Sequence, residues 1–214
     1  MGHPVRTIVY VDGFNLYYGA VKGTPYKWLD LGALFRSLLS AQNQITAIKY
    51  YTAIVSPRPN DPDIPIRQMA YLNALEAYMP GITVTRGHYL SSVVTMMLET
   101  PMNGQRFARV YKTEEKGSDV NLALHMVNDG WRNDYDCAVI VSNDSDLSEA
   151  MRIVKVELRK KLVLIVPGDP AVRRPSAQLR RYANKTMSIP VAALAASQLP
   201  NPIPGTTIHK PAGW

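Results

Sequence analysis

The amino-acid sequence predicts an α/β fold with a mainly parallel central sheet. Short apolar segments typical of strands alternate along the chain with longer segments of helical periodicity, and this alternation is typical of parallel strands joined by helices. The length of 214 residues is enough for one domain with a sizeable core. In addition, aspartates follow two of the predicted strands and open a predicted helix. Strand ends are where open α/β sheets bind ligands.

Five segments are predicted to be strands because they are rich in branched or aromatic apolar side chains. In chain order they are residues 7–11, 45–55, 82–88, 137–142 and 162–166. Four segments are predicted to be helices, at residues 31–42, 64–79, 118–131 and 144–159. The last two carry apolar residues three and four positions apart, so each has one apolar stripe to present to the sheet.

Residues 89–115 do not follow the strand–helix alternation. The segment RFARVYKTE alternates between apolar and polar side chains and, with the preceding LSSVVTMML, predicts a hairpin inserted into the domain. We therefore expect one domain over residues 1–190 and a proline-rich tail over residues 191–214. The last fifteen residues are expected to form neither helix nor sheet, with Trp214 anchoring them to the body.

The net charge of +7 is unevenly distributed along the chain. Acidic residues are concentrated between Glu114 and Glu149, whereas the stretch that follows, as far as Lys185, is rich in arginine and lysine. Basic surface beside a group of carboxylates is expected of a protein that binds a polyanion such as RNA. Charge runs are also common on solvated helix faces, so charge alone leaves both interpretations open.

Composition argues against a membrane protein or a secreted one. No segment approaches the roughly 20 apolar residues that cross a bilayer, and the N-terminus lacks the charged and apolar regions of a signal peptide. The single cysteine, Cys137, lies in a predicted strand and is expected to be buried. We expect a cytoplasmic protein without disulfides and without a membrane partner.

Four aspartates form the candidate site. Asp12 follows the first strand in TIVYVDGFN, and Asp119 opens a predicted helix in EEKGSDVNLAL. Asp144 and Asp146 follow a strand in CAVIVSNDSDL. Carboxylates brought together repel one another unless a cation lies between them, and hard oxygen ligands favour Mg²⁺ or Mn²⁺ over zinc. A single aspartate is common in turns and caps, so it is the combination of three segments that favours a metal site.

A metal held by these aspartates suits phosphoryl chemistry. One ion can polarise a phosphoryl oxygen and activate a bound water, and two can stabilise both the attacking and the leaving oxygen. The histidines are scattered without the spacing of a zinc site. Asn15 follows Asp12 by three residues. It either orients a water or a phosphate, or only closes a turn beside Gly13, and the sequence leaves both interpretations open.

Three stretches of the sequence resemble the NYN-domain family, its LabA-like branch in particular, within the PIN-like nuclease group. They are VYVDGFNLYYG, KGSDVNLALHMV and YDCAVIVSNDSDLSEAMRIV followed by KKLVLIV. The resemblance covers roughly residues 6–190 and rests on the order and spacing of the three motifs together. It implies a Rossmann-like three-layer sandwich with a mainly parallel sheet, an acidic metal pocket and ribonuclease activity.

Carried over by position, the resemblance also implies roles for individual residues. The four aspartates would hold Mg²⁺ or Mn²⁺ and act in catalysis, with Asn15 beside Asp12. Lys116 precedes the aspartate of KGSD and would contact a phosphate. Independently of the resemblance, the spacing of the last predicted helix puts Arg152 and Lys155 on its polar side, where we expect them to hold the RNA backbone. His125 stands where many relatives carry an aspartate, a difference that thins the acidic shell or changes the preferred metal.

Two functions are therefore carried forward from the sequence. The first is a metal-dependent ribonuclease that hydrolyses RNA phosphodiester bonds. The alternative is a catalytically weak or inactive RNA-binding regulatory protein that retains the acidic pocket. For that alternative, aromatic rings near the N-terminus either stack on bases or fill the core; they belong to Tyr17, Tyr18, Tyr26 and Trp28. RNA is the expected partner in both cases, and a homodimer is compatible with the sequence.

Overall fold

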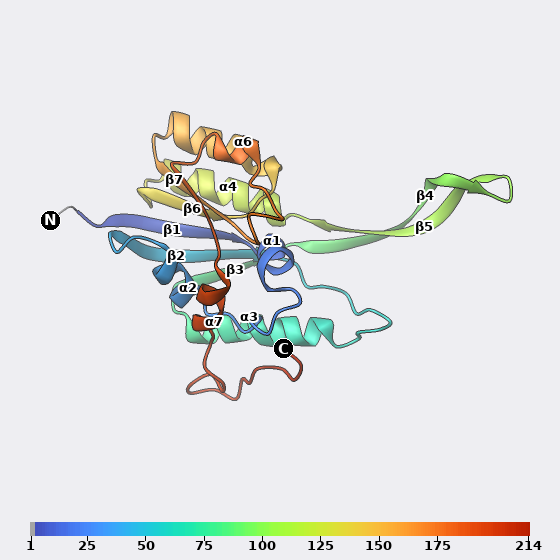
Figure 1. Cartoon of the computed structure of the whole chain (residues 1–214), viewed down its shortest axis with the longest axis horizontal. Helices are drawn as coiled ribbons and strands as arrows, with labels where there is room; N and C mark the ends of the chain where they lie inside the picture. Colours follow the sequence, from blue (N-terminus) through green and yellow to red (C-terminus); the bar gives the residue numbers. More distant parts are fainter. Residues whose placement is uncertain (1–2) are drawn as a thin grey trace.

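The computed structural model describes residues 3–214 and contains a parallel sheet of six strands (Figure 1). The strands are β1 (Val5–Asp12), β2 (Asn43–Thr52), β3 (Ile82–Arg86), β6 (Cys137–Val141), β7 (Lys161–Val166) and β8 (Lys185–Ser188). Their order is β3-β2-β1-β6-β7-β8, and every neighbouring pair is parallel. The order reverses between β1 and β6, as in doubly wound α/β proteins. The predicted α/β fold with a mainly parallel sheet is confirmed.

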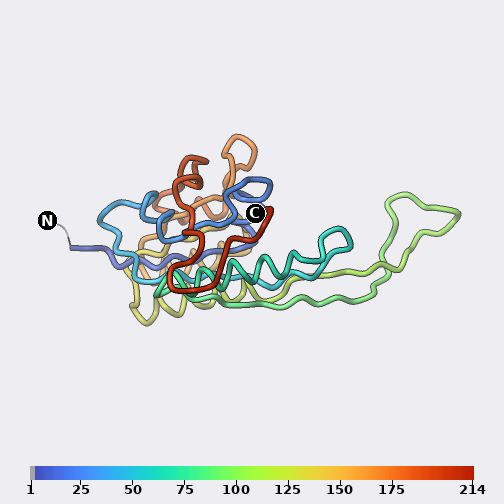
Figure 2. The backbone as a smooth tube through the Cα atoms, turned by 90° about the horizontal axis from the view of Figure 1, so that it is seen from below, coloured from blue at the N-terminus to red at the C-terminus, as the bar shows by residue number. Residues whose placement is uncertain are grey.

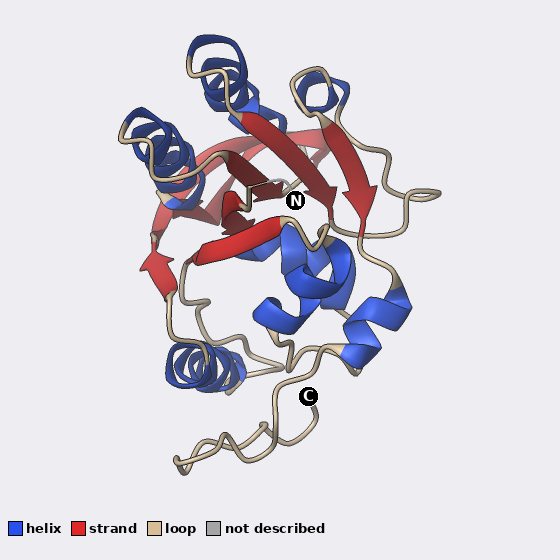
Figure 3. Ribbon diagram, turned by 90° about the vertical axis from the view of Figure 1, so that its left-hand side faces the viewer, coloured by secondary structure: helices blue, strands red, loops and turns tan. Residues whose placement is uncertain are grey.

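Helices cover both faces of the sheet and complete three layers (Figure 3). One face carries α4 (Ser118–Trp131), α6 (Ala177–Arg180) and a continuous helical segment made of η2 (Ser145–Leu147), α5 (Ser148–Arg152) and η3 (Ile153–Glu157). The other face carries α2 (Leu31–Leu38), α3 (Ile64–Tyr78) and α7 (Val191–Ala196). The short helices α1 (Gly13–Leu16) and η1 (Tyr17–Val21) follow directly after β1.

The core lies in two layers, one on each face of the sheet. Successive residues of a strand point to opposite faces, so Val9 and Val11 belong to one buried cluster while Ile8 and Tyr10 belong to the other. A parallel strand covered on both faces therefore reads as a continuous apolar run, which is why β1 and β6 were recognisable in the sequence. Cys137 is buried in β6, and this burial raises the pKa of its thiol to about 11.

The structure differs from the sequence-based expectation at several elements, and it adds the short helices α6 and α7, the second of them within the expected tail. β8 was missed, because KTMS is short and lacks a run of apolar residues. The helix expected over residues 31–42 ends at Leu38, where the chain becomes extended before β2. The helix expected over residues 144–159 opens with a 3₁₀ turn and closes with a π-helical turn, so it is not regular at either end. Short π segments of this kind are often found near functional sites.

Strands β4 (His88–Met102) and β5 (Gln105–Lys116) form an antiparallel hairpin that projects from the body (Figures 1 and 2). Its turn is Asn103-Gly104, and both residues have positive φ, as the tight turns that match strand twist require. Apolar side chains are exposed along it, among them Met97 and Tyr111. The core of the domain therefore does not depend on the hairpin.

Residues after α7 pack on the body without forming a helix or strand. The indole nitrogen of Trp28 donates a hydrogen bond to the carbonyl of Pro200 at 3.1 Å. The ring of Trp214 lies 6.3 Å from that of Trp28 and 5.7 Å from that of Tyr71, between ring centres. Trp214 thus contacts the body as expected. Within residues 3–214, no helix has both the length and the apolar character needed to cross a bilayer.

Candidate functional site

The carboxyl ends of β1 and β6 meet where the strand order reverses, and Asp12 lies there. Its side chain is 3% exposed. One carboxylate oxygen accepts a hydrogen bond from the backbone nitrogen of Asn15 at 2.9 Å. The other accepts from the amide of Asn15 at 2.6 Å and from the hydroxyl of Ser142 at 2.8 Å. Burial raises the pKa of Asp12, and the nearby charge of Asp144 adds to this, while the hydrogen bonds act in the opposite direction.

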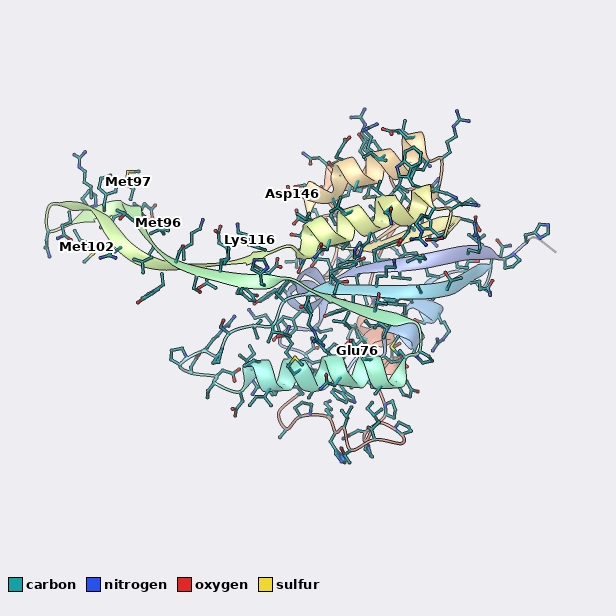
Figure 4. The ribbon with its side chains drawn as sticks, turned by 180° about the vertical axis from the view of Figure 1, so that it is seen from behind. Glu76, Met96, Met97, Met102, Lys116 and Asp146 are labelled. Atoms are coloured by element: carbon teal, nitrogen blue, oxygen red, sulfur yellow. The ribbon has the colours of Figure 1, made fainter. Side chains whose placement is uncertain are left out.

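The loop after β6 places two further carboxylates at the same edge. The hydroxyl of Ser142 accepts a hydrogen bond from the backbone nitrogen of Asp144 at 3.0 Å, so this one serine contacts Asp12 as well as the loop. Asp144 caps the following 3₁₀ turn by accepting from the backbone nitrogen of Asp146 at 3.0 Å. Asp146 is exposed in the first turn and lies at the end of the sheet from which the hairpin leaves (Figure 4).

Asp119 reaches this edge from the first turn of α4. The chain turns from β5 into α4 at Gly117, whose φ of 101° is readily adopted only by glycine. The pKa of Asp119 is raised to about 6, first by burial and then by the charges of Asp12 and Asp144. Carboxylates far apart in the sequence therefore act on one another electrostatically in the fold.

Asparagine and arginine side chains connect three loops at the site. The amide oxygen of Asn15 accepts a hydrogen bond from the guanidinium of Arg173 at 2.5 Å and from the backbone nitrogen of Asn143 at 3.3 Å. Asn15 closes the turn on Asp12 and also holds a cationic side chain at the site, while its role in orienting a water or a phosphate stays a prediction. Arg173 was not among the predicted site residues, although the basic segment PGDPAVRR follows a predicted strand, where ligand-binding residues are expected.

Glu115 is a further acidic residue that the sequence analysis did not select. Its carboxylate accepts hydrogen bonds from the backbone nitrogen and the hydroxyl of Ser118, at 3.1 and 2.8 Å. Its charge also contributes to the raised pKa of Asp119. Its position just before the KGSD motif was the available signal. Glu115 thus extends the acidic group to the foot of the hairpin.

The cations chosen from the sequence are engaged with neighbouring side chains. Lys116, at the foot of the hairpin (Figure 4), pairs with Glu114 at 3.4 Å. Arg152 pairs with Glu149 and Glu157, each at 2.7 Å, and Lys155 donates to the side-chain oxygen of Asn184 at 2.8 Å. Exposed pairs of this kind are worth about 0–1 kcal/mol, so a phosphate can displace them. The structure nevertheless puts Arg173, rather than these three, in contact with a candidate site residue.

His125 does not join the acidic group. Its ring contacts the hydroxyl of Tyr51 at 3.0 Å, and Tyr51 belongs to the core on the α4 face of the sheet. The effect of His125 on the acidic shell or on the preferred metal stays a prediction. Of the aromatic residues considered for base stacking, Trp28 is 1% exposed and belongs to the core, whereas Tyr18 is 48% exposed.

The donor set at this edge fits a hard divalent cation. It consists of carboxylates and an amide, which are oxygen ligands. A cation between them would offset the repulsion that, after burial, raises the pKa of Asp119. Among residues 3–214, no three acidic, histidine or cysteine side chains are already posed as a complete ligand set. Side-chain rotation of the partly exposed Asp119, Asp144 and Asp146 would therefore accompany binding.

The repulsion at Asp119 leads to a prediction about stability. The folded pKa of about 6 exceeds the ordinary value of 3.8, so the folded state loses stability as pH rises through this range. Asp119→Asn removes that loss and should raise the Tm of metal-free protein at pH 7.5 by about 2–4 °C, with no gain near pH 4. Differential scanning fluorimetry tests this. A variant that is no more stable than the wild type at pH 7.5 would contradict the electrostatic description.

Comparison with known proteins adds a family and a fold. The chain matches the NYN domain over residues 6–190. A protein of Pseudomonas putida named 6-hydroxy-3-succinoylpyridine 3-monooxygenase HspA is 37% identical over 237 aligned residues, covering 99% of this chain and 76% of that protein. A crystal structure of a protein of unknown function from Vibrio parahaemolyticus matches with a TM-score of 0.54 and 20% identity, covering 89% of this chain and 96% of that one.

The structural likeness, at this level of identity, supports the fold alone. The family match extends over most of the chain and includes the three motifs that contribute the acidic edge. An NYN domain indicates a nuclease-type protein, which agrees with carboxylates gathered at the point where the strand order reverses. The chain belongs to the NYN domain family.

Proposed function

We propose that this protein is a metal-dependent ribonuclease of the LabA-like branch, acting on RNA in the cytoplasm. The observation that carries the proposal is the gathering of carboxylates at one sheet edge, where the Ser142 hydroxyl contacts both Asp12 and the loop that bears Asp144. The raised pKa of Asp119, caused first by burial and then by the charges of Asp12 and Asp144, agrees with this gathering. Mg²⁺ or Mn²⁺ would be held by Asp12, Asp119, Asp144 and Asp146. When bound, such an ion polarises a phosphoryl oxygen and lowers the pKa of a bound water.

Each residue at the edge has a role that follows from its contacts. Ser142 and the backbone of Asn15 orient the Asp12 carboxylate, leaving part of its hydrogen-bonding capacity free. The amide nitrogen of Asn15 donates to Asp12, and its second hydrogen would orient a water or a phosphate oxygen, while Arg173 beside it would supply a cation for the phosphodiester. Lys116, Arg152 and Lys155 extend the cationic surface along the RNA backbone by exchanging their present partners.

The proposal predicts metal-dependent cleavage of labelled single-stranded RNA. The purified protein is incubated with Mn²⁺, with Mg²⁺ and with EDTA, beside the double variant Asp144→Asn/Asp146→Asn. Cleavage should occur with either metal, stop in EDTA, and fall by at least about 10²-fold in the double variant, because the ion loses two anionic ligands. Cleavage that persists in EDTA would contradict the metal-dependent mechanism.

Two outcomes of the same assay identify other functions. RNA binding without cleavage in either metal supports the alternative of a regulatory RNA-binding protein that retains the pocket. The 37% identity to a protein named as a hydroxypyridine monooxygenase favours a second candidate, chemistry on a small aromatic acid. Consumption of 6-hydroxy-3-succinoylpyridine in the presence of dioxygen and a two-electron donor tests it. Turnover of that compound without any cleavage of RNA would replace the ribonuclease proposal.

A homodimer also stays a proposal, and the exposed hairpin supports it. A two-stranded hairpin is marginally stable alone in water, yet Met96, Met97 and Met102 are exposed near its tip (Figure 4).

Because Leu90 pairs with Glu114, residues 91–113 can be replaced by Asn-Gly. The Tm should stay within about 2 °C of wild type, since the hairpin does not contribute to the core. Sedimentation should show a dimer for the full chain only, and identical masses would contradict a hairpin-mediated dimer.

A further inference from the structure

A pocket of about 420 Å³ opens beside the acidic edge, on the α3 side of the sheet. This volume is in the range of sites for small organic molecules and too small for a folded partner. Gly13 and Phe14, which immediately follow Asp12 in the chain, form part of its lining. The backbone of the α1 turn therefore lies between the pocket and the candidate metal site.

Aromatic side chains form much of the pocket wall. Tyr17 and Phe14 come from the turn after β1, Tyr71 comes from α3, and Trp214 comes from the tail that packs over α3. Aromatic rings placed around a cavity of this size favour a planar ligand, because stacked and edge-to-face arrangements both require a flat partner. Two of the rings, Tyr17 and Tyr18, are among those considered above for base stacking, and both line the pocket.

Tyr50 is a deeply buried polar residue of the pocket lining. Tyr50 on β2 is 7% exposed and lines the cavity. Its hydroxyl makes no hydrogen bond to another side chain or backbone group within residues 3–214, whereas the neighbouring Tyr51, on the other face of the sheet, contacts His125. Among the described residues, only the side-chain oxygen of Gln198 is both fully buried and unpartnered, so the Tyr50 hydroxyl keeps some accessible surface, where a ligand atom could accept or donate a hydrogen bond to it.

The position of Tyr50 is fixed by the backbone of the candidate site. A Cβ atom added to Gly13 would lie 2.7 Å from the ring and from the hydroxyl of Tyr50. Contact this close requires glycine at the residue after Asp12, so the turn that presents Asp12 also seats the Tyr50 ring. The pocket and the acidic edge are parts of one local structure.

Charged side chains complete the lining, two cationic and one acidic: Lys27, Arg67 and Asp61. Arg67 is held by Asp61 at 2.5 Å, and Lys27 has no ion pair within the described residues 3–214. A planar ring that carries an anionic group would place its ring among the aromatic side chains and its charge near Lys27. Nucleotides and small heteroaromatic acids share this chemistry.

We propose that this pocket binds a single planar heteroaromatic ring bearing an anionic group, with the Tyr50 hydroxyl bonding an edge atom of the ring. The ring comes either from a nucleotide or from a free small molecule. In the nucleotide case the inference rests on the proposed ribonuclease function, and the base would belong to the strand whose phosphate lies at Asp12. Binding itself requires neither metal nor turnover.

Isothermal titration calorimetry in EDTA tests binding without cleavage. The probes are adenosine and uridine 5′-monophosphates, nicotinate as a free heteroaromatic acid, and ribose 5-phosphate as a ligand without a ring base. At least one ring-bearing probe should bind about 10-fold or more tightly than ribose 5-phosphate. Nucleotide binding alone identifies a nucleobase site, and nicotinate binding alone identifies a small-molecule site. If ribose 5-phosphate binds as tightly as every other probe, the proposal is overturned.

Three variants locate the bound ring. Tyr50→Phe keeps the ring but removes the hydroxyl and should lower the affinity for the tightest-binding probe by about 3–10-fold. Ile64→Trp fills the pocket from the start of α3 and should weaken binding of the tightest-binding probe by 10-fold or more. The Tm of this variant is recorded to show that it folds. Tyr51→Phe is the matched control outside the pocket and should bind as wild type does. Wild-type affinity in both pocket variants would rule out this pocket as the site.

The two proposals fail separately. If RNA is not cleaved but a ring-bearing probe binds and Tyr50→Phe weakens it, the hydrolysis proposal fails and the pocket assignment stands. If RNA is cleaved in an Asp144- and Asp146-dependent manner while both pocket variants leave probe binding and KM for RNA unchanged, the pocket assignment fails alone.

Discussion

Asp12→Asn is expected to reduce metal-dependent RNA cleavage by roughly 10³-fold or more while the protein remains folded. The substitution removes the most buried negative charge of the acidic edge, and loss of several kcal/mol of charge stabilisation corresponds to this change in rate. Folding should be retained because asparagine has nearly the same shape and its side-chain oxygen can still accept from the backbone nitrogen of Asn15, although its NH₂ group cannot accept the bonds that the Asn15 amide and Ser142 now donate. Single-turnover cleavage in Mn²⁺, with circular dichroism of the same sample, provides the measurement.

The outcome at Asp12 separates the two functions carried forward from the sequence. A folded variant that cleaves at the wild-type rate would remove Asp12 from the mechanism and, with it, the ribonuclease proposal. Calorimetry with Mn²⁺ provides an independent reading, because the variant should also bind the ion more weakly. Ser142→Ala is a milder companion substitution, since it removes one hydrogen bond to the Asp12 carboxylate but keeps the charge.

Asp129 is expected to give the opposite result, a large loss of stability without a specific loss of catalysis. Its carboxylate is 8% exposed and accepts from Lys49 and from the hydroxyl of Tyr10, each at 2.6 Å. Asp129→Ala leaves a partly buried ammonium and a buried hydroxyl without their partner, which costs about 3–5 kcal/mol. For a chain of this size the Tm should fall by about 10 °C.

Urea unfolding followed by tryptophan fluorescence measures the loss at Asp129. Cleavage per folded molecule, determined below the onset of unfolding, should stay within about threefold of wild type, because Asp129 is not part of the acidic edge. A variant with normal stability would contradict the description of a buried ion pair, and a folded variant without activity would place Asp129 in the mechanism. Comparison with Asp12→Asn thus distinguishes an acidic residue of the site from an acidic residue of the core.

The sequence predicted the candidate aspartates because their signal is local. An apolar strand that ends in a carboxylate can be read within ten residues, as in TIVYVDGFN and CAVIVSNDSDL, and parallel strands bring their carboxyl ends to one edge. Arg173 and Glu115 were missed because each sits beside the expected motifs rather than within them. Arg152 and Lys155 were selected from helical spacing, which indicates a solvated face but not which side chains are already paired on it.

The sequence by itself determined the fold class and the identity of the carboxylates, because strand composition, helical spacing and motif order depend on neighbouring residues. The tertiary structure alone decided which distant groups share an environment. It brought Asp119 close enough to Asp12 and Asp144 to raise its pKa, and it joined Asn15 to Arg173 across 158 positions of the chain. It also left the hydroxyl of Tyr50 facing a pocket while that of Tyr51, the next residue, bonds His125. Electrostatic coupling and burial depend on distance in space, which spacing along the chain does not specify.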